Sequence, residues 1–223
     1  MSLQSQLLHY DDLVEIKARD NGEPILSVQK HIPEIICTYV KKDMLPLFGE
    51  TMYARKGVVE RLQQAQELLH QENSEAQLKL VYAYRHASIQ EKYFNARTQE
   101  VRQIFPEADE EELIRQAHLL SASPDVAGHP TGGAIDATIT SPDGDYDMGT
   151  KIADFSEYKK IRTFYEGLTK EQKNNRLLLR NILTDVGFAP FDGEWWHFSY
   201  GDKEWAAYYD HTTTLYDTVD LTK

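Results

Sequence analysis

A change of hydrophobic period between residues 56 and 84 restricts the possible folds more than any other feature of the chain. Through residues 56–72, apolar side chains recur at helical spacing with Glu and Gln between them, which predicts an amphipathic helix. The next apolar run, LKLVYAY at 78–84, begins with apolar and polar side chains in alternation, which predicts a strand. The sequence therefore predicts a fold in which helices and strands are mixed.

Further strand signals occur on both sides of this region. AIDATIT at 134–140 alternates and predicts a strand that ends at the turn SPDGD, and the aromatic stretch 194–200 predicts another strand. Residues 24–40 are rich in β-branched side chains, so we expect them to be extended, with a break at Pro33.

Further helices complete the pattern. One helix is predicted in each of 88–105 and 109–120, and two in 156–186, with Gly187 as the C-cap of the last. Because helices and strands do not alternate regularly, an α+β fold is favoured over a doubly wound one. We expect a single domain spanning 1–223, in which a central, mostly antiparallel sheet is flanked by helices and roughly the first 20 residues are peripheral.

The bulk composition fits one globular domain and limits its partners. A chain of 223 residues buries roughly 70% of its unfolded surface, and 41% hydrophobic and 27% charged residues are ordinary globular proportions. The net charge of −12 argues against binding to nucleic acid or to an anionic membrane, because their phosphates would be repelled. The sequence carries no feature that sets an oligomeric state.

The N-terminus and the single cysteine bear on location. The chain does not open with a basic region followed by an apolar stretch, and no run approaches the ~20 apolar residues of a membrane span. We therefore expect a cytoplasmic protein. Cys37 lies in the apolar run IICTYV and is expected to be a buried, unreactive thiol.

Polar residues in two segments have the composition of a catalytic zinc site. His129 lies in the glycine-rich loop GHPTGGAID, Asp136 begins the strand after it, and His197 lies in GEWWHF. Two imidazoles and a carboxylate are a suitable ligand set for zinc at the central sheet, with a fourth position for water. Zinc lowers the pKa of such a water toward ~7, and Glu194 would act as its general base.

The residues alone also allow a plainer interpretation. A loop histidine, an aspartate at the start of a strand and an edge-strand histidine are common, and the chain contains no H-E-x-x-H helix or G-x-S-x-G turn. The acids of DGDYD at 143–147 alternate as in a calcium loop, but Met148 stands where that loop requires glycine. A turn between strands is therefore favoured there.

Together, AGHPTGGAID at 127–136 and EWWHF at 194–198 resemble two motifs of the D-alanyl-D-alanine dipeptidase family of zinc peptidases, S-x-H-x-x-G-x-A-x-D and E-x-W-H. This family includes the vancomycin-resistance dipeptidases and is related to D,D-carboxypeptidases. VYAYR at 81–85 resembles the family's strand that ends in a functional arginine, and MGT at 148–150 resembles a segment after its metal-binding strand. The resemblance spans roughly residues 35–210.

The resemblance implies a role for each matching residue. His129, Asp136 and His197 would be the ligands of one zinc ion per chain, Glu194 the catalytic base, and Arg85 the group that polarises the scissile carbonyl and stabilises the oxyanion. The last role is chemically sound, because a fixed cation stabilises developing negative charge. From the residues alone, an ion pair at a strand end is the alternative for Arg85. The implied partner is a small peptide substrate.

Two positions depart from the family pattern. Ala127 stands where the family has serine, and Ala153 stands where it has an aspartate that binds the substrate's free ammonium group. Asp154 follows one place later, and with Trp196 it is a candidate substrate-binding residue. Neither departure touches the metal ligands or the base, so hydrolysis is predicted while selection for a free amino group is left open.

Three functions are therefore compared. The leading hypothesis is a zinc dipeptidase that cleaves D-alanyl-D-alanine or a related small dipeptide. The second is a D,D-carboxypeptidase that acts on cell-wall peptides, against which the missing export signal argues. The third is a non-catalytic binding module that contains zinc, which has no need of Glu194 or Arg85.

The segment GEWWHF also sets a geometric condition. In a regular strand, positions i and i+3 face opposite sides, so Glu194 and His197 can share a metal only if the chain bends between them. Gly193 is expected to start that bend. Trp195 and Trp196 would then pack the acid and the ligand in place, and their apolar surroundings would raise the pKa of Glu194.

Overall fold

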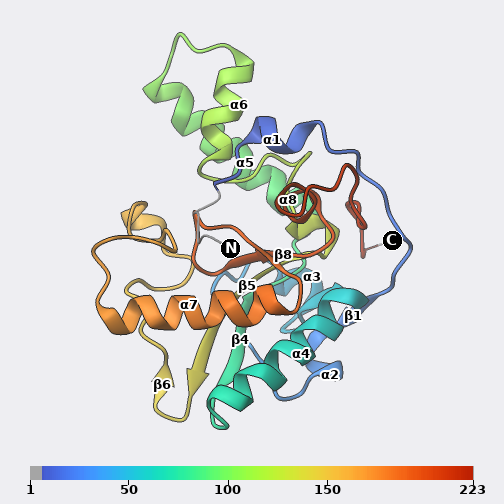
Figure 1. Cartoon of the computed structure of the whole chain (residues 1–223). Coiled ribbons are helices and arrows are strands. Elements are labelled where there is room, and N and C mark those ends of the chain that lie inside the picture. Colours follow the sequence, from blue (N-terminus) through green and yellow to red (C-terminus); the bar gives the residue numbers. More distant parts are fainter. Residues whose placement is uncertain (1–6, 223) are drawn as a thin grey trace.

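The computed structural model describes residues 7–222 and shows an α+β fold built on one central sheet (Figure 1). The strand order is β2-β4-β5-β8-β7, and β6 pairs with β5. β2 and β4 are parallel, whereas the other neighbouring pairs are antiparallel. The strands of this sheet are β2 (Ile36–Cys37), β4 (Gln77–Tyr82), β5 (Ala134–Ser141), β6 (Gly144–Asp145), β7 (Ala189–Pro190) and β8 (His197–Ser199).

Helices pack around this sheet. α4 (Lys56–Glu72) and α7 (Lys170–Asp185) contact each other, and they contact β4 and β7 respectively (Figure 1). α5 (Ala87–Ile104) and α6 (Glu110–His118) pair with each other and project at the top of Figure 1. The shorter elements are α1 (Tyr10–Val14), β1 (Ile25–Ser27), α2 (Val28–His31), α3 (Leu45–Phe48), β3 (Tyr53–Arg55), the 3-10 helices η1 (His129–Thr131) and η2 (Phe155–Glu157), and α8 (Lys203–Tyr208).

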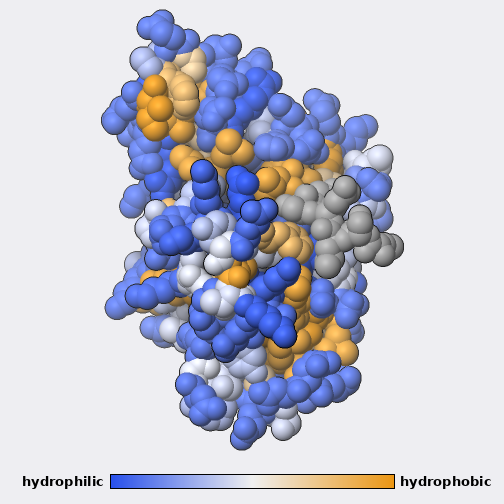
Figure 2. Space-filling view, turned by 60° about the vertical axis from the view of Figure 1, so that its left-hand side comes forward, coloured by the Kyte–Doolittle hydropathy of each residue, from blue (hydrophilic) through white to orange (hydrophobic). Residues whose placement is uncertain are grey.

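The projecting α5–α6 pair has a small apolar core of its own. Phe94 and Val101 of α5 pack there against Leu113 and Ala117 of α6, apart from the main core around the sheet. Figure 2 shows apolar surface on the upper part of the molecule, where this pair lies. No helix within residues 7–222 is long and apolar enough to cross a membrane.

The predicted fold class and the mostly antiparallel central sheet are confirmed. α4 has the predicted bounds, because its buried side chains Val58, Leu62 and Leu69 follow helical spacing. β5 contains the whole predicted strand, and residues 142–143 turn the chain back into β6, so the turn predicted at SPDGD is confirmed, while residues 144–145 of the stretch 143–147 form a strand. α5 and α6 lie close to the ranges predicted for them, and Gly187 follows α7 with a φ of 96°.

The prediction of a first helix within 156–186, ahead of α7, is wrong. Residues 158–169 form turns, and α7 is the one α-helix in that range. The buried guanidinium of Arg176 on α7 explains the irregular path. It donates to the backbone oxygens of Met148 at 2.7 Å, Arg162 at 2.6 Å and Lys160 at 2.9 Å. Tertiary hydrogen bonds thus satisfy carbonyls that a helix would have satisfied internally.

Two predicted extended segments are shorter than expected. Within 24–40, residues 28–31 form the helical turn α2, which begins where the Ser27 hydroxyl accepts a hydrogen bond from the Lys30 backbone. The strand predicted at 194–200 is limited to His197–Ser199. Cys37 is half-buried rather than buried, and burial raises the pKa of its thiol to about 12, which disfavours a reactive thiolate.

Candidate metal centre and active site

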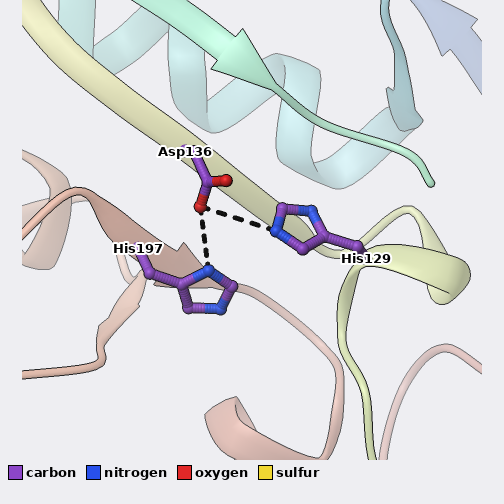
Figure 3. A group of neighbouring side chains, drawn as sticks. All are labelled: His129, Asp136 and His197. Carbon is purple, nitrogen blue, oxygen red and sulfur yellow. Dashed lines mark hydrogen bonds and ion pairs between the residues drawn. The ribbon is translucent and has the colours of Figure 1, made fainter. Parts of the chain in front are cut away.

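The pairing of β5 with β8 places Asp136 directly opposite His197. Oδ1 of Asp136 lies 3.0 Å from Nδ1 of His197, and both side chains are buried (Figure 3). The two residues are 61 positions apart in the chain, so the register of the sheet brings them together. These antiparallel partners share one face of the sheet, as side chains of directly opposed residues do.

The loop before β5 supplies the third member of the group. His129 opens η1, and Gly132 ends it in the left-handed conformation, with a φ of 75°, that lets the chain turn back into β5. Nε2 of His129 then lies 3.5 Å from Oδ1 of Asp136 (Figure 3). Nδ1 of His129 donates to the backbone oxygen of Ala83 at 2.7 Å, which leaves the Nε2 lone pair facing the centre.

The three side chains fit a tetrahedral zinc ion. One ligand atom of each residue lies within 4.8 Å of the other two, and all three residues are buried. Ligand atoms about 2.0–2.1 Å from zinc lie about 3.3 Å apart at tetrahedral angles, close to the contacts of 3.0 and 3.5 Å made by Asp136. Two imidazoles and one carboxylate are also donors that zinc prefers.

Burial and neighbouring charges shift the pKa values of His129, Asp136 and His197. Burial and the Arg85 guanidinium both lower the pKa of His129, which favours the uncharged ring that a metal ligand needs. Burial would raise the pKa of Asp136, but His129 and His197 outweigh it and hold this pKa well below its usual range. Burial would lower the pKa of His197, but Glu204 and Asp136 raise it well above its usual value.

A turn places Glu194 beside this group. The backbone N–H of His197 donates to the Glu194 oxygen at 3.1 Å, and the Glu194 N–H donates to the Phe191 oxygen at 3.0 Å. The predicted bend between Glu194 and His197 is therefore confirmed. Burial raises the pKa of Glu194 to about 7, His197 opposes that rise, and Asp136 adds to it.

Arg85 reaches the site from the end of β4. Its backbone N–H donates to the His129 oxygen at 3.2 Å, which ties the residue to the η1 loop. Nη1 of its guanidinium donates to Gln90 on α5 at 2.7 Å, and the group lies 4.3 Å from the ring centroid of Tyr82. Its Nε is buried and has no hydrogen-bond acceptor within residues 7–222.

A cavity of about 240 Å³ joins these residues. His129, Asp136, His197, Glu194 and Arg85 all line it. Side chains from α5 also line it, among them Tyr93, Arg97 and Glu100, as do Ala127 and Ala153.

The two candidate substrate-binding residues do not line this cavity. Asp154 is exposed, and its carboxylate accepts a hydrogen bond from the Ser156 backbone at 3.0 Å at the start of η2. Trp196 is fully buried and packs edge-on against Phe155, with 5.5 Å between the ring centroids. The sequence assignment of both residues to substrate stays a prediction.

Glu204 is a site residue that the sequence did not reveal. Its Oε2 lies 3.1 Å from Nε2 of His197 and accepts a hydrogen bond from the Ser199 hydroxyl at 3.2 Å. In the sequence, an acid in the first turn of a helix is an ordinary partner of the helix dipole, so nothing marks Glu204 out.

The C-terminal segment contacts the η1 loop, which carries His129, and the turn after β8, the strand that carries His197. The backbone N–H of Val219 donates to the Pro130 oxygen in η1 at 3.0 Å. The N–H groups of Leu215 and Tyr216 donate to the Gly201 oxygen, in the turn after β8, at 2.7 and 2.9 Å.

A buried His–Asp–His group beside a carboxylate and an arginine, in an α+β fold, is the arrangement of a metal-dependent hydrolase. The family follows from the sequence comparison. Residues 43–216 match the peptidase M15 family, described as D-ala-D-ala dipeptidase, and the chain belongs to this family. It is therefore a zinc metallopeptidase.

Two relatives that are named as D-alanyl-D-alanine dipeptidases agree with this assignment. The chain is 27% identical over 186 residues to a D-alanyl-D-alanine dipeptidase of Synechocystis sp., which covers 73% of this chain and 75% of the relative. It is 35% identical over 94 residues to the D-alanyl-D-alanine dipeptidase of Escherichia coli, covering 37% of this chain and 47% of that one. Among solved structures, the LdcB LD-carboxypeptidase superposes with a TM-score of 0.46 at 18% identity, over 87% of this chain and 77% of LdcB.

Proposed function

We propose that this protein is a zinc-dependent dipeptidase that hydrolyses D-alanyl-D-alanine or a related small dipeptide. The observation that carries the proposal is the meeting, in one cavity, of the His–Asp–His group with Glu194 and Arg85. Membership of the family described as D-ala-D-ala dipeptidase and the two relatives of that name support it.

The proposed metal ligands are His129, Asp136 and His197, for one ion per chain. Zinc bound there would supply a Lewis acid that activates water and polarises a carbonyl at neutral pH. The chain's contribution is a pre-formed donor set, because the His129 tautomer and the Asp136–His197 pair are already fixed by hydrogen bonds.

The proposed general base is the carboxylate of Glu194. It takes a proton from the attacking water and then gives that proton to the leaving amino nitrogen. Such a shuttle works best when the pKa of the carboxyl lies near the working pH, and burial raises the pKa of Glu194 to about 7. The turn through Trp195 and Trp196 keeps this carboxylate on the same cavity as the metal ligands.

Arg85 is proposed to stabilise the oxyanion. Its guanidinium is held by Gln90 and packed on Tyr82, so it is oriented before substrate binds. A fixed cation at the developing negative charge is typically a large contribution to acyl transfer. The buried Nε without an acceptor agrees with a group whose partner comes from outside the protein.

The size of the cavity favours a small substrate. About 240 Å³ is below the usual range for drug-sized ligands and suits a dipeptide better than a long peptide strand. One observation favours the second candidate, a D,D-carboxypeptidase acting on cell-wall peptides. Ala153 lines the cavity where an ammonium-binding carboxylate was expected, and Asp154 points elsewhere.

The base assignment is tested with Glu194→Gln. Zinc binding should be retained, while hydrolysis of D-alanyl-D-alanine should fall about 10²- to 10⁴-fold, because proton transfer is lost. The matched control is Glu100→Gln, since Glu100 lines the same cavity but pairs with Arg97 at 2.6 Å. Full activity in Glu194→Gln would refute the mechanism, and zinc binding without hydrolysis in the wild type would favour a binding module.

Substrate class is tested with a panel of D-D, L-D and L-L dipeptides and an N-acylated tripeptide, with zinc and with chelator. Preference for a free D-D dipeptide supports the dipeptidase, and preference for the acylated peptide supports the carboxypeptidase. The single-domain extent over 1–223 and the cytoplasmic location stay predictions of this proposal.

A further inference from the structure

We propose that Glu204 is a positioning residue that fixes the ring of His197 so that Nδ1, and not Nε2, serves as the metal ligand. This inference rests on the proposed function, because it concerns the same metal centre. Its basis is geometric: Asp136 and Glu204 contact opposite nitrogens of one imidazole.

The two contacts define the ring orientation. Nδ1 of His197 lies 3.0 Å from Oδ1 of Asp136, on the side that faces His129. Nε2 lies 3.1 Å from Oε2 of Glu204 on the other side. An ionised carboxylate only accepts hydrogen bonds, so Nε2 must carry the proton, and in the neutral ring the Nδ1 lone pair then faces the centre.

His129 shows the opposite arrangement. Its Nδ1 donates outward to the Ala83 oxygen and its Nε2 faces Asp136. The protein thus presents one histidine through Nε2 and the other through Nδ1. In each case the outer nitrogen has an acceptor, as ligand histidines usually do.

The chain after β8 is shaped to place Glu204. Ser199 lies two residues after His197 on the same face of β8, and its hydroxyl donates to the same Oε2. Gly201, with a φ of 78°, reverses the chain, and Asp202 starts α8 by accepting a hydrogen bond from the Trp205 backbone at 2.9 Å. Glu204 consequently returns to the ring of a residue seven positions earlier.

Among the described residues, the Glu204 carboxylate has one close basic partner, His197. Within the described chain, His197 is the one basic side chain with a nitrogen within 4.0 Å of the Glu204 carboxylate. A buried carboxylate is costly unless it is paired and hydrogen-bonded. The position of Glu204 is therefore explained by His197, and a residue that served packing alone would not need a charge there.

The first test reads the ring directly in the wild-type zinc-loaded protein. Long-range ¹H–¹⁵N correlation spectra of protein labelled with ¹⁵N-histidine report which nitrogen of His197 carries the proton. We expect a proton on Nε2, protected from exchange, and none on Nδ1. A proton on Nδ1 with Nε2 bound to zinc would overturn the proposal, and this test needs no variant to fold.

The second test measures zinc affinity by chelator competition, starting from metal-free protein. Glu204→Gln keeps the size of the side chain but removes the charge, and it should bind zinc about 10- to 100-fold more weakly. Glu204→Asp keeps the charge but withdraws it by one methylene, and it should also bind more weakly. The matched control, Glu100→Gln, makes the same chemical change at a cavity residue that pairs with Arg97 and should keep wild-type affinity.

The outcomes separate this inference from the proposed function. If Glu204→Gln folds, by circular dichroism and thermal unfolding, and binds zinc as tightly as the wild type, the role of Glu204 is refuted while the peptidase assignment stands. If the wild type binds no zinc through His129, Asp136 and His197, both fall. Loss of affinity in both Glu204 variants, with the Glu100 control unchanged, supports the inference.

Discussion

The two histidines of the site occupy equivalent places around Asp136, yet their outer nitrogens are held in different ways. Nδ1 of His129 donates to a backbone oxygen, that of Ala83, at 2.7 Å. Nε2 of His197 faces a side-chain carboxylate, that of Glu204, at 3.1 Å. We call the η1 loop with His129 the first half of the site and the β8 segment with His197 the second half. A backbone oxygen therefore holds the histidine of the first half, whereas a side chain that can be substituted holds the histidine of the second.

Each half also brings one polar group for the proposed chemistry. Arg85 belongs to the first half, since its backbone N–H is bonded to His129. Glu194 belongs to the second, since the turn that ends at His197 begins with it. A cation and a base thus reach the substrate from separate segments, and they can be disturbed separately.

Removal of either histidine ligand should have the largest effect on zinc binding and hydrolysis. His129→Ala and His197→Ala should each lose stoichiometric zinc, and hydrolysis should fall to the level of the metal-free enzyme, because two ligands do not complete a catalytic zinc site. Zinc content after dialysis and dipeptide hydrolysis measure this. A variant that kept one zinc per chain would remove its histidine from the ligand set and break the comparison.

A change at Arg85, the cation of the first half, should have the next largest effect. Arg85→Lys should lower kcat about 10²- to 10³-fold with zinc content unchanged, because a lysine cannot keep the planar contacts to Gln90 and Tyr82 that orient the group. The control is Arg97→Lys, which makes the same change at a cavity residue paired with Glu100. Equal kcat in Arg85→Lys and wild type would exclude the oxyanion role.

The turn of the second half should respond to a smaller change. In Gly201→Ala, the new methyl group would lie 2.5 Å from ring carbons of Tyr216, at a φ that is strained for alanine. We expect a loss of about 1–3 kcal/mol in the free energy of unfolding and weaker zinc binding, since Glu204 follows this turn. Gly22→Ala separates the effect of the strained φ from that of the contact with Tyr216, because Gly22 has a φ of 77° and no atom within 4 Å of the added carbon. Equal losses in chemical denaturation would show that the contact with Tyr216 has no effect.

The smallest effect concerns Glu194 in metal-free protein. Its folded pKa of about 7 lies above its ordinary value of 4.5, so between these pH values the folded state binds a proton that the unfolded state releases. Stability due to this group is therefore present at low pH and lost as pH rises through 7. Glu194→Gln should gain about 1–2 kcal/mol over the wild type at pH 8, because each pKa unit corresponds to about 1.4 kcal/mol and the side chain keeps some solvent contact. That gain should vanish near pH 4 in denaturant unfolding, and a difference independent of pH would contradict the assignment.

Local patterns predicted the parts of the fold that local forces determine. α4 and β5 were predictable because their buried positions repeat with the period of their own element. Residues 158–169 were not, because the three backbone oxygens that Arg176 binds belong to segments distant from it in sequence. Propensity yields to tertiary hydrogen bonds at such places.

The site divides in the same way. The set of His129, Asp136, His197 and Glu194 could be proposed from the residue types, and the family resemblance added Arg85. The structure brings all five to one cavity. Glu204 could not be proposed in this way, because its approach to His197 depends on the chain reversal at Gly201 and on the α8 start at Asp202. A sequence shows the residue types of a site more readily than the supports that orient them.

The contacts of the C-terminal segment also bear on how the site forms during synthesis. Val219 is bonded to η1, and Leu215 and Tyr216 are bonded to the turn after β8, so this segment links the two halves without supplying a ligand. The ribosome makes it after every ligand and after Glu204. Nascent chains that already expose all the zinc-binding side chains therefore lack these backbone contacts to η1 and to the turn after β8 until residues 215–219 emerge, although β5 and β8 can pair before then.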